Sequence, residues 1–224
     1  MRRYIALLPR WVEFSIVITI AFGPLILESL LYVFLPHPPA KFSDSQLASL
    51  LVYEISILAA LLGFLHLRGW TLAQLGLRVT IADTLIGVAL AVVGDLASVA
   101  AYWAIAVVWP QAADAMASTQ IGSQELSLWA VVAVSVVNPI FEETFVCGYV
   151  IAALKERPDP WTGINVSVTI RLLYHLYQGA AAAISIVPIG LLLGIWYART
   201  GRLWPLIVAH ALWDFLPLAM YVHW

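Results

Sequence analysis

The sequence predicts an all-α membrane protein with about seven transmembrane helices. Of its 224 residues, 62% are hydrophobic and only 11% are charged, whereas a soluble domain carries about 25% charged residues. Apolar runs of roughly 17–25 residues, the length that spans a bilayer, recur along the whole chain. Because no soluble second domain stands out, residues 1–224 are expected to form one transmembrane domain.

The predicted spans follow one another with short connections. The first begins after three arginines and continues to Leu35 without a cleavage pattern, so it is interpreted as a retained helix rather than a signal peptide. The fifth and sixth are separated at Gln178–Gly179, because one helix across both would be far too long to span. The predicted spans are 12–35, 46–66, 81–108, 127–153, 163–179, 181–198 and 203–222.

The basic residues predict the orientation of these spans. If the N-terminus is cytoplasmic, the inner segments hold nine lysines and arginines, and the outer segments hold only Lys41. Such a bias follows the positive-inside rule. We therefore expect a multi-pass protein with a cytoplasmic N-terminus and with Trp224 on the outer side. The net charge of −2 offers no basic surface for nucleic acid. Membrane lipid and a peptide are the expected partners.

Charged residues inside the apolar spans are the main functional signal. Glu142 and Glu143 lie side by side in the fourth span, where each carboxylate costs roughly 2.5–3.5 kcal/mol on insertion scales. Two further polar pairs have members four residues apart, which places both members on one helical face. These pairs are Arg171 with His175 in the fifth span, and His210 with Asp214 in the seventh.

The depths of these groups agree with one another. At about 1.5 Å per helical residue, Glu143 lies roughly 15 Å from the cytoplasmic end of its span, and the other polar groups lie roughly 10–18 Å in. They share one layer, which predicts an intramembrane site reached from the cytoplasmic side. Glu54 and Asp95 are also deep, and for Asp95 a structural hydrogen bond is favoured. The single cysteine, Cys147, excludes a disulfide and a cysteine metal cluster.

Three segments resemble the motifs of one protease family. The segment from Phe141 to Tyr149, FEETFVCGY, resembles the EExxxR motif of the CAAX-protease and bacteriocin-processing (CPBP, or Abi) intramembrane endopeptidases. Residues 171–175 lie where that family has FxxxH, and residues 210–214 match its HxxxN/D motif. The resemblance covers residues 127–216, a protease-like core on spans four, five and seven. Residues 1–126, with three N-terminal spans, add little to it.

The sequence departs from the family pattern at two positions. Cys147 replaces the arginine of EExxxR, and Arg171 replaces the phenylalanine of FxxxH. An arginine four residues after Glu143 would neutralise that buried carboxylate. Since Arg171 lies at nearly the same depth on the next span, we expect it to supply the missing charge and to form a salt bridge with Glu143 or Glu142.

The resemblance implies a peptidase that acts on a membrane-associated or lipid-modified, CAAX-like peptide. It makes Glu142 the general base, with His175 orienting the water, while His210 and Asp214 polarise the scissile carbonyl group. The implied catalytic set is Glu142, Glu143, His175, His210 and Asp214, with Arg171 in support. Glu142, His175 and His210 could also form an open site for a divalent metal such as zinc, although no HExxH motif is present.

Two other function classes remain open at this stage. A proton-coupled transporter would use the same acids and histidines as a relay, and it requires a polar path to both faces of the membrane. The absence of an internal repeat counts mildly against it. A non-catalytic scaffold related to the proteases is the third interpretation, because Cys147 stands where the family has arginine.

Overall fold

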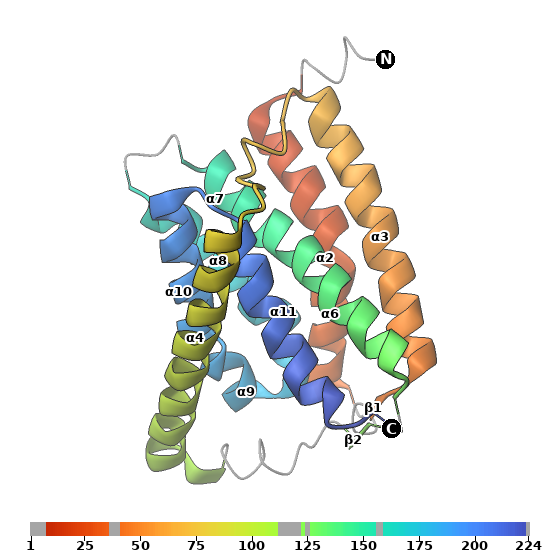
Figure 1. The fold of residues 1–224 in the computed structure, drawn as a ribbon, viewed down its shortest axis with the longest axis vertical. Helices are drawn as coiled ribbons and strands as arrows, with labels where there is room; N and C mark the ends of the chain where they lie inside the picture. Colours follow the sequence, from red (N-terminus) through yellow and green to blue (C-terminus); the bar gives the residue numbers. More distant parts are fainter. Residues whose placement is uncertain (1–7, 36–40, 112–121, 124–125, 156–158, 223–224) are drawn as a thin grey trace.

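The computed structural model of the protein is a bundle of helices (Figure 1). It describes residues 8–35, 41–111, 122–123, 126–155 and 159–222. The N-terminal helices are α2 (Arg10–Phe34), α3 (Asp44–Leu67) and α4 (Ile81–Val108). The later elements are α6 (Leu128–Glu143), η1 (Thr144–Tyr149), α7 (Val150–Ala153), α8 (Trp161–Tyr174), η2 (Leu176–Gln178), α9 (Ala180–Ser185), α10 (Val187–Thr200) and α11 (Trp204–Ala219). Two short strands, β1 (Lys41–Phe42) and β2 (Gly122–Ser123), pair in parallel.

The prediction of an all-α, polytopic membrane protein is confirmed. Within the described residues, five helical segments are long and apolar enough to cross a membrane: α2, α3, α4, the continuous segment Leu128–Ala153 and the continuous segment Ala180–Thr200. The helix α11 is apolar but shorter, with 16 residues, and α8 has 14 residues. Each of the seven predicted spans therefore has a helical counterpart.

The fifth span is shorter than predicted. The helix α8 ends at Tyr174 rather than near residue 179, because the chain leaves the α-helix at His175 and continues as the 3₁₀ turn η2. The predicted break at Gly179 is confirmed. Its φ of 92° lies in a region that favours glycine, and α9 begins at the following residue.

The fourth span lies at the centre of the bundle. Of its most apolar window, 67% is buried, compared with 22% for each of α2, α3 and α4. It packs against α3 and α11 through α6, and against α2, α8 and α10 through η1. Figure 1 shows this green segment surrounded by the other helices. The helix that carries the two glutamates is thus the one most shielded from the surroundings.

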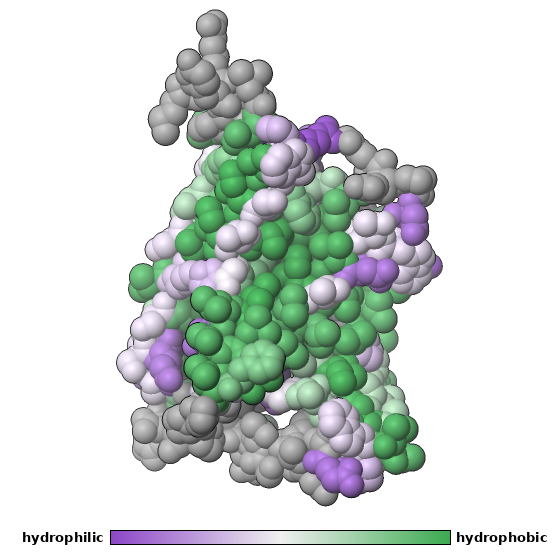
Figure 2. All heavy atoms as spheres, turned by 180° about the vertical axis from the view of Figure 1, so that it is seen from behind, coloured by the Kyte–Doolittle hydropathy of each residue, from purple (hydrophilic) through white to green (hydrophobic). Residues whose placement is uncertain are grey.

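Apolar side chains cover much of the outer surface. The helix α4 exposes large hydrophobic side chains along its length, including Leu85, Val92, Leu96, Trp103 and Val107. On the face shown in Figure 2, hydrophobic residues cover most of the surface. A surface of this kind would associate or aggregate in water, but it is the surface expected of helices in contact with lipid.

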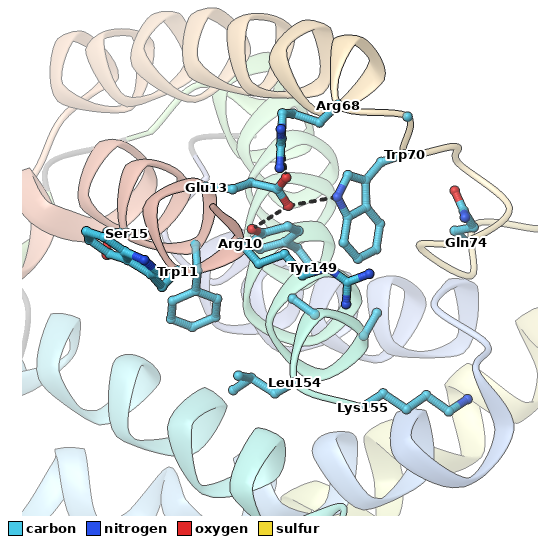
Figure 3. A pocket seen from close by; sticks show the side chains of 14 residues that line it. Arg10, Trp11, Glu13, Ser15, Arg68, Trp70, Gln74, Tyr149, Leu154 and Lys155 are labelled. Atoms are coloured by element: carbon cyan, nitrogen blue, oxygen red, sulfur yellow. Dashed lines mark hydrogen bonds and ion pairs between the residues drawn. The ribbon is translucent and has the colours of Figure 1, made fainter. Parts of the chain in front are cut away.

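A polar network ties the π-helical segment η1 to the end of the bundle where α2 begins. The carboxylate of Glu13 accepts hydrogen bonds from Arg68 Nε at 2.5 Å, Trp70 Nε1 at 2.9 Å and the Tyr149 hydroxyl at 3.1 Å (Figure 3). Glu13 is buried, and these partners come from two other segments of the chain, the turn after α3 and η1. The network lines a cavity of about 740 Å³, and it anchors η1 immediately after the two glutamates.

Candidate active site

Glu142 and Glu143 end the helix α6 and are followed directly by the π-helix η1. Pro139 within α6 has no N–H to donate to the helix ladder, so the ladder is already interrupted before the glutamates. π-helical turns are rare and are frequent at functional sites. The two neighbouring side chains have different surroundings. Glu143 is completely buried, whereas Glu142 is 6% exposed and lines a cavity.

The helix α8 brings a cation to both glutamates. The Nη2 atom of Arg171 lies 2.8 Å from Oε1 and 2.9 Å from Oε2 of Glu143, and its Nη1 atom lies 3.5 Å from Oε2 of Glu142. Arg171 is itself buried. The salt bridge predicted between spans four and five is therefore confirmed. Cys147, which occupies the motif's arginine position, is fully buried, and its Sγ lies 3.7 Å from Ser167 Oγ.

The same helix places a hydroxyl group on Glu142. Tyr174 lies three residues after Arg171 and so shares its helical face, and its O–H donates to Glu142 Oε2 at 2.5 Å. The tyrosine ring stacks on Phe22 of α2, with centroids 5.2 Å apart. One oxygen of Glu142 is thus held in a fixed direction by a side chain that is itself fixed by packing.

The helix α11 contributes His210 and Asp214. His210 Nδ1 lies 2.7 Å from Glu143 Oε1, and because Arg171 pairs with that carboxylate, the ring nitrogen is the donor. His210 Nε2 lies 3.5 Å from Asp214 Oδ1 and 3.9 Å from Glu142 Oε2. Asp214 Oδ2 accepts a hydrogen bond from Asn138 Nδ2 at 3.0 Å. Asp214 is therefore oriented by α6 while it stands beside the imidazole.

His175 lies at the end of α8 and lines the same cavity as Glu142. Its Nδ1 atom lies 2.8 Å from the backbone oxygen of Arg171. A carbonyl oxygen can only accept, so Nδ1 carries the proton of a neutral ring and Nε2 keeps a free lone pair. The structure thus presents His175 as an acceptor. The residue lies directly after the end of α8, rather than inside a helix as the sequence predicted.

The cavity beside Glu142 has a volume of about 900 Å³. From Glu142 and His210 it extends between α2, α3 and α11 as far as Phe42, Ser45 and Tyr221. These three residues lie at the end of the bundle that carries the β1–β2 pair, opposite the end where α2 begins (Figure 1). The sequence predicts an approach from the side on which the N-terminus lies, whereas the cavity extends toward the opposite end of the bundle. Depth along one helix does not reveal which side of a bundle is hollow.

Three of the buried groups could hold a metal ion. Ligand atoms of Glu142, Glu143 and His210 all lie within 4.8 Å of one another. This set differs from the predicted one, since it contains Glu143 in place of His175. As arranged, both oxygens of Glu143 are engaged by Arg171, and Oε1 is also bonded to His210 Nδ1. A cation would have to displace these partners, so the residues do not fit a zinc ion in this arrangement.

The structure places all six predicted site residues around one point, and it adds two that sequence reasoning missed. Glu143, Arg171 and His210 are joined directly, and Glu142, His175 and Asp214 line the adjoining cavity. The additional residues are Tyr174 and Asn138. Their helical spacing was a usable signal, because Tyr174 follows Arg171 by three positions and Asn138 precedes Glu142 by four.

Comparison with known proteins supports the motif resemblance. Residues 124–216 match the family model described as type II CAAX prenyl endopeptidase Rce1-like. The matched region contains α6, α8 and most of α11, and hence all six predicted site residues together with Tyr174 and Asn138, while α2, α3 and α4 lie outside it. Searches of curated proteins and of solved structures gave no significant match.

Proposed function

We infer that this chain, whose residues 124–216 carry the core of the Rce1-like CAAX prenyl endopeptidases, hydrolyses a peptide bond of a membrane-associated or lipid-modified, CAAX-like peptide. The observation that carries this proposal is the position of Glu142. It lies on the wall of a large cavity, and Tyr174 and Arg171 both contact its Oε2 atom. A fixed carboxylate at the edge of a cavity is suited to activate a water molecule.

The proposed reaction begins with proton transfer from water to the carboxylate of Glu142. The water oxygen then bonds to the carbonyl carbon of the scissile peptide, and the carbonyl oxygen takes up the negative charge. His175 orients the water through the free lone pair of Nε2. When the carbon–nitrogen bond breaks, Glu142 returns its proton to the leaving amine. The products are a carboxylic acid and an amine, the acid passes its remaining proton to the amine to give a carboxylate and an ammonium group, and the carboxylate of Glu142 is regenerated.

His210 is proposed to stabilise the charge on the carbonyl oxygen. Its Nδ1 atom is bonded to Glu143, and a protonated ring is favoured between three carboxylates. The distances from Nε2 to Asp214 and Glu142, 3.5 and 3.9 Å, are too long for good hydrogen bonds. This N–H is therefore available to a developing oxyanion. The role of Asp214 is to keep the ring charged and oriented.

Hydrolysis of a prenylated peptide is the direct test of this proposal. Purified protein in detergent should cleave a farnesylated peptide that ends in a CAAX tetrapeptide, and mass spectrometry in ¹⁸O-labelled water should find one labelled oxygen in the new carboxylate. Because Arg171 and His210 already occupy the carboxylate of Glu143, we expect the rate to persist after dialysis against EDTA. An inactive dialysed protein that zinc reactivates would show that a metal, rather than the residues alone, activates the water.

The side from which the substrate enters follows from the cavity and the basic residues together. We propose that the N-terminus and the segment after Lys155 are cytoplasmic, as the positive-inside rule indicates. The cavity then extends toward the outer side, since Ser45 and Tyr221 lie at the opposite end of the bundle. A peptide presented at the outer leaflet is accordingly the proposed substrate, rather than a peptide on a cytoplasmic protein.

Cysteine labelling in intact cells checks this orientation. Ser45→Cys should react with a membrane-impermeant maleimide, whereas Gln74→Cys should react only after the cells are opened. Both positions are exposed and lie at opposite ends of the molecule, and the native Cys147 is fully buried and should give little background. The reverse labelling pattern would place the cavity mouth on the cytoplasmic side.

A further inference from the structure

Glu54, in the middle of α3, is a buried acid that lies outside the protease-like core. It is 1% exposed and lines the same cavity as Glu142, His210 and Asp214. Its Oε2 atom has no hydrogen-bond partner within the part of the chain that the structure describes. Buried polar atoms are nearly always bonded. A completely buried carboxyl oxygen on the wall of a candidate substrate cavity is therefore expected to bind a ligand.

The charges around the cavity favour an uncharged Glu54. Three carboxylates, Glu142, Glu143 and Asp214, are balanced by at most two positive groups, Arg171 and His210. Glu54 interacts electrostatically with two of these carboxylates and with His210. A fourth negative charge without a cation of its own would be costly at this depth. A neutral carboxyl group, in contrast, has an O–H that can donate a hydrogen bond.

We propose that Glu54 is an uncharged hydrogen-bond donor that binds a backbone carbonyl oxygen of the peptide in the cavity. This inference rests on the proposed peptidase function. Two neighbouring donors are already engaged, since the Tyr174 hydroxyl bonds to Glu142 and an N–H of Asn138 bonds to Asp214, and the His210 Nε2–H is assigned to the oxyanion. A peptide that leaves water must satisfy its carbonyl groups. Glu54 supplies the donor from a helix that carries none of the family motifs.

Peptide binding by catalytically silenced variants tests the role of Glu54. In a Glu142→Gln background, the dissociation constant of a fluorescent farnesylated CAAX peptide should rise about tenfold on Glu54→Leu, which corresponds to the loss of one hydrogen bond. Glu54→Gln keeps an uncharged donor of similar shape, so it should bind within about threefold of the background. Asp95→Asn is the matched control, because Asp95 is a membrane-embedded acid that is exposed on α4 and does not line the cavity.

The melting temperature in detergent separates this role from a structural one. Since Glu54→Leu removes a buried oxygen that has no partner, it should not lower the melting temperature. Unchanged binding by Glu54→Leu, equal losses in Glu54→Leu and Glu54→Gln, or no peptide binding at all would each overturn the proposal, as would a weaker affinity that accompanies a lower melting temperature. If the wild-type protein cleaves no peptide while Glu54→Leu still weakens binding, only the proposed hydrolysis fails.

Discussion

Replacement of Glu142 by glutamine is expected to lower the kcat of peptide hydrolysis by at least about 10²-fold, the usual contribution of a general base. Glutamine keeps the shape of the side chain and can still accept the Tyr174 hydrogen bond, but it cannot take a proton from water. The melting temperature in detergent should change little, because the substitution removes a buried charge and its desolvation cost. Single-turnover rates on a farnesylated peptide would measure the effect on the chemical step.

A matched control guards against a general effect of removing an acid from the membrane domain. Asp95→Asn makes the same chemical change on α4, away from the cavity, and should retain nearly the full rate. If Glu142→Gln keeps a rate within about tenfold of the wild type, Glu142 is not the base. Asp214, which also lines the cavity, would then be the next carboxylate to examine.

The cavities bear on the transporter alternative. A proton relay needs a polar path to both faces of the membrane, but the cavity at Glu142 extends toward one end only. The cavity at the other end is lined by Glu13, Arg68 and Tyr149, and none of the described residues lines both cavities. Phe145, which is fully buried in η1, belongs to the packed core between them. This arrangement favours a closed-ended cleft, as in an enzyme, over a channel.

The parts of the site that the sequence revealed are those that carry a high cost in a membrane. Glu143 and Arg171 could be paired in advance because charges in apolar spans need partners, and because Arg171 lies at nearly the depth of the missing motif arginine. The salt bridge between Arg171 and Glu143 was predicted in this way, at 2.8 Å in the structure. The cost of burying a charge thus identified both partners of this salt bridge, although they lie on different helices. The contact between His210 and Glu143 was not predicted.

Features that cost little in an apolar sequence could not be predicted. Helical spacing places Tyr174 on the same face as Arg171, but the bond of its hydroxyl to Glu142 depends on how α8 packs against α6. The π-helix η1 has no sequence signature comparable to a glycine or a proline cap. The early end of α8 depends on the turn before Gly179. The direction of the cavity depends on gaps between several helices, which hydropathy does not describe.

The replacement of Arg171 by leucine is expected to lower both activity and stability. It leaves the buried carboxylate of Glu143 without its cation, and the removal of one partner from a buried ion pair costs about 3–5 kcal/mol. Glu143 would then compete with Glu142 for a proton, and a protonated Glu142 cannot act as a base. Arg171→Lys is the matched control, because it keeps the charge but has one nitrogen in place of the two that contact Glu143 and Glu142. It should retain more activity and a higher melting temperature than Arg171→Leu.

A second substitution tests whether Arg171 replaces the arginine that the family motif carries four residues after its second glutamate. Adding Cys147→Arg to Arg171→Leu should restore part of the lost activity and melting temperature. Cys147 Sγ lies 3.7 Å from Ser167 Oγ, which is one turn before Arg171 on α8, so a new guanidinium group would lie beside the space that Arg171 vacates. In the wild-type background the same Cys147→Arg change should be harmful, because it adds a second cation to a packed site. Harmless loss of Arg171 would show that the site does not need this cation. A double variant worse than Arg171→Leu alone would show that the two positions are not interchangeable.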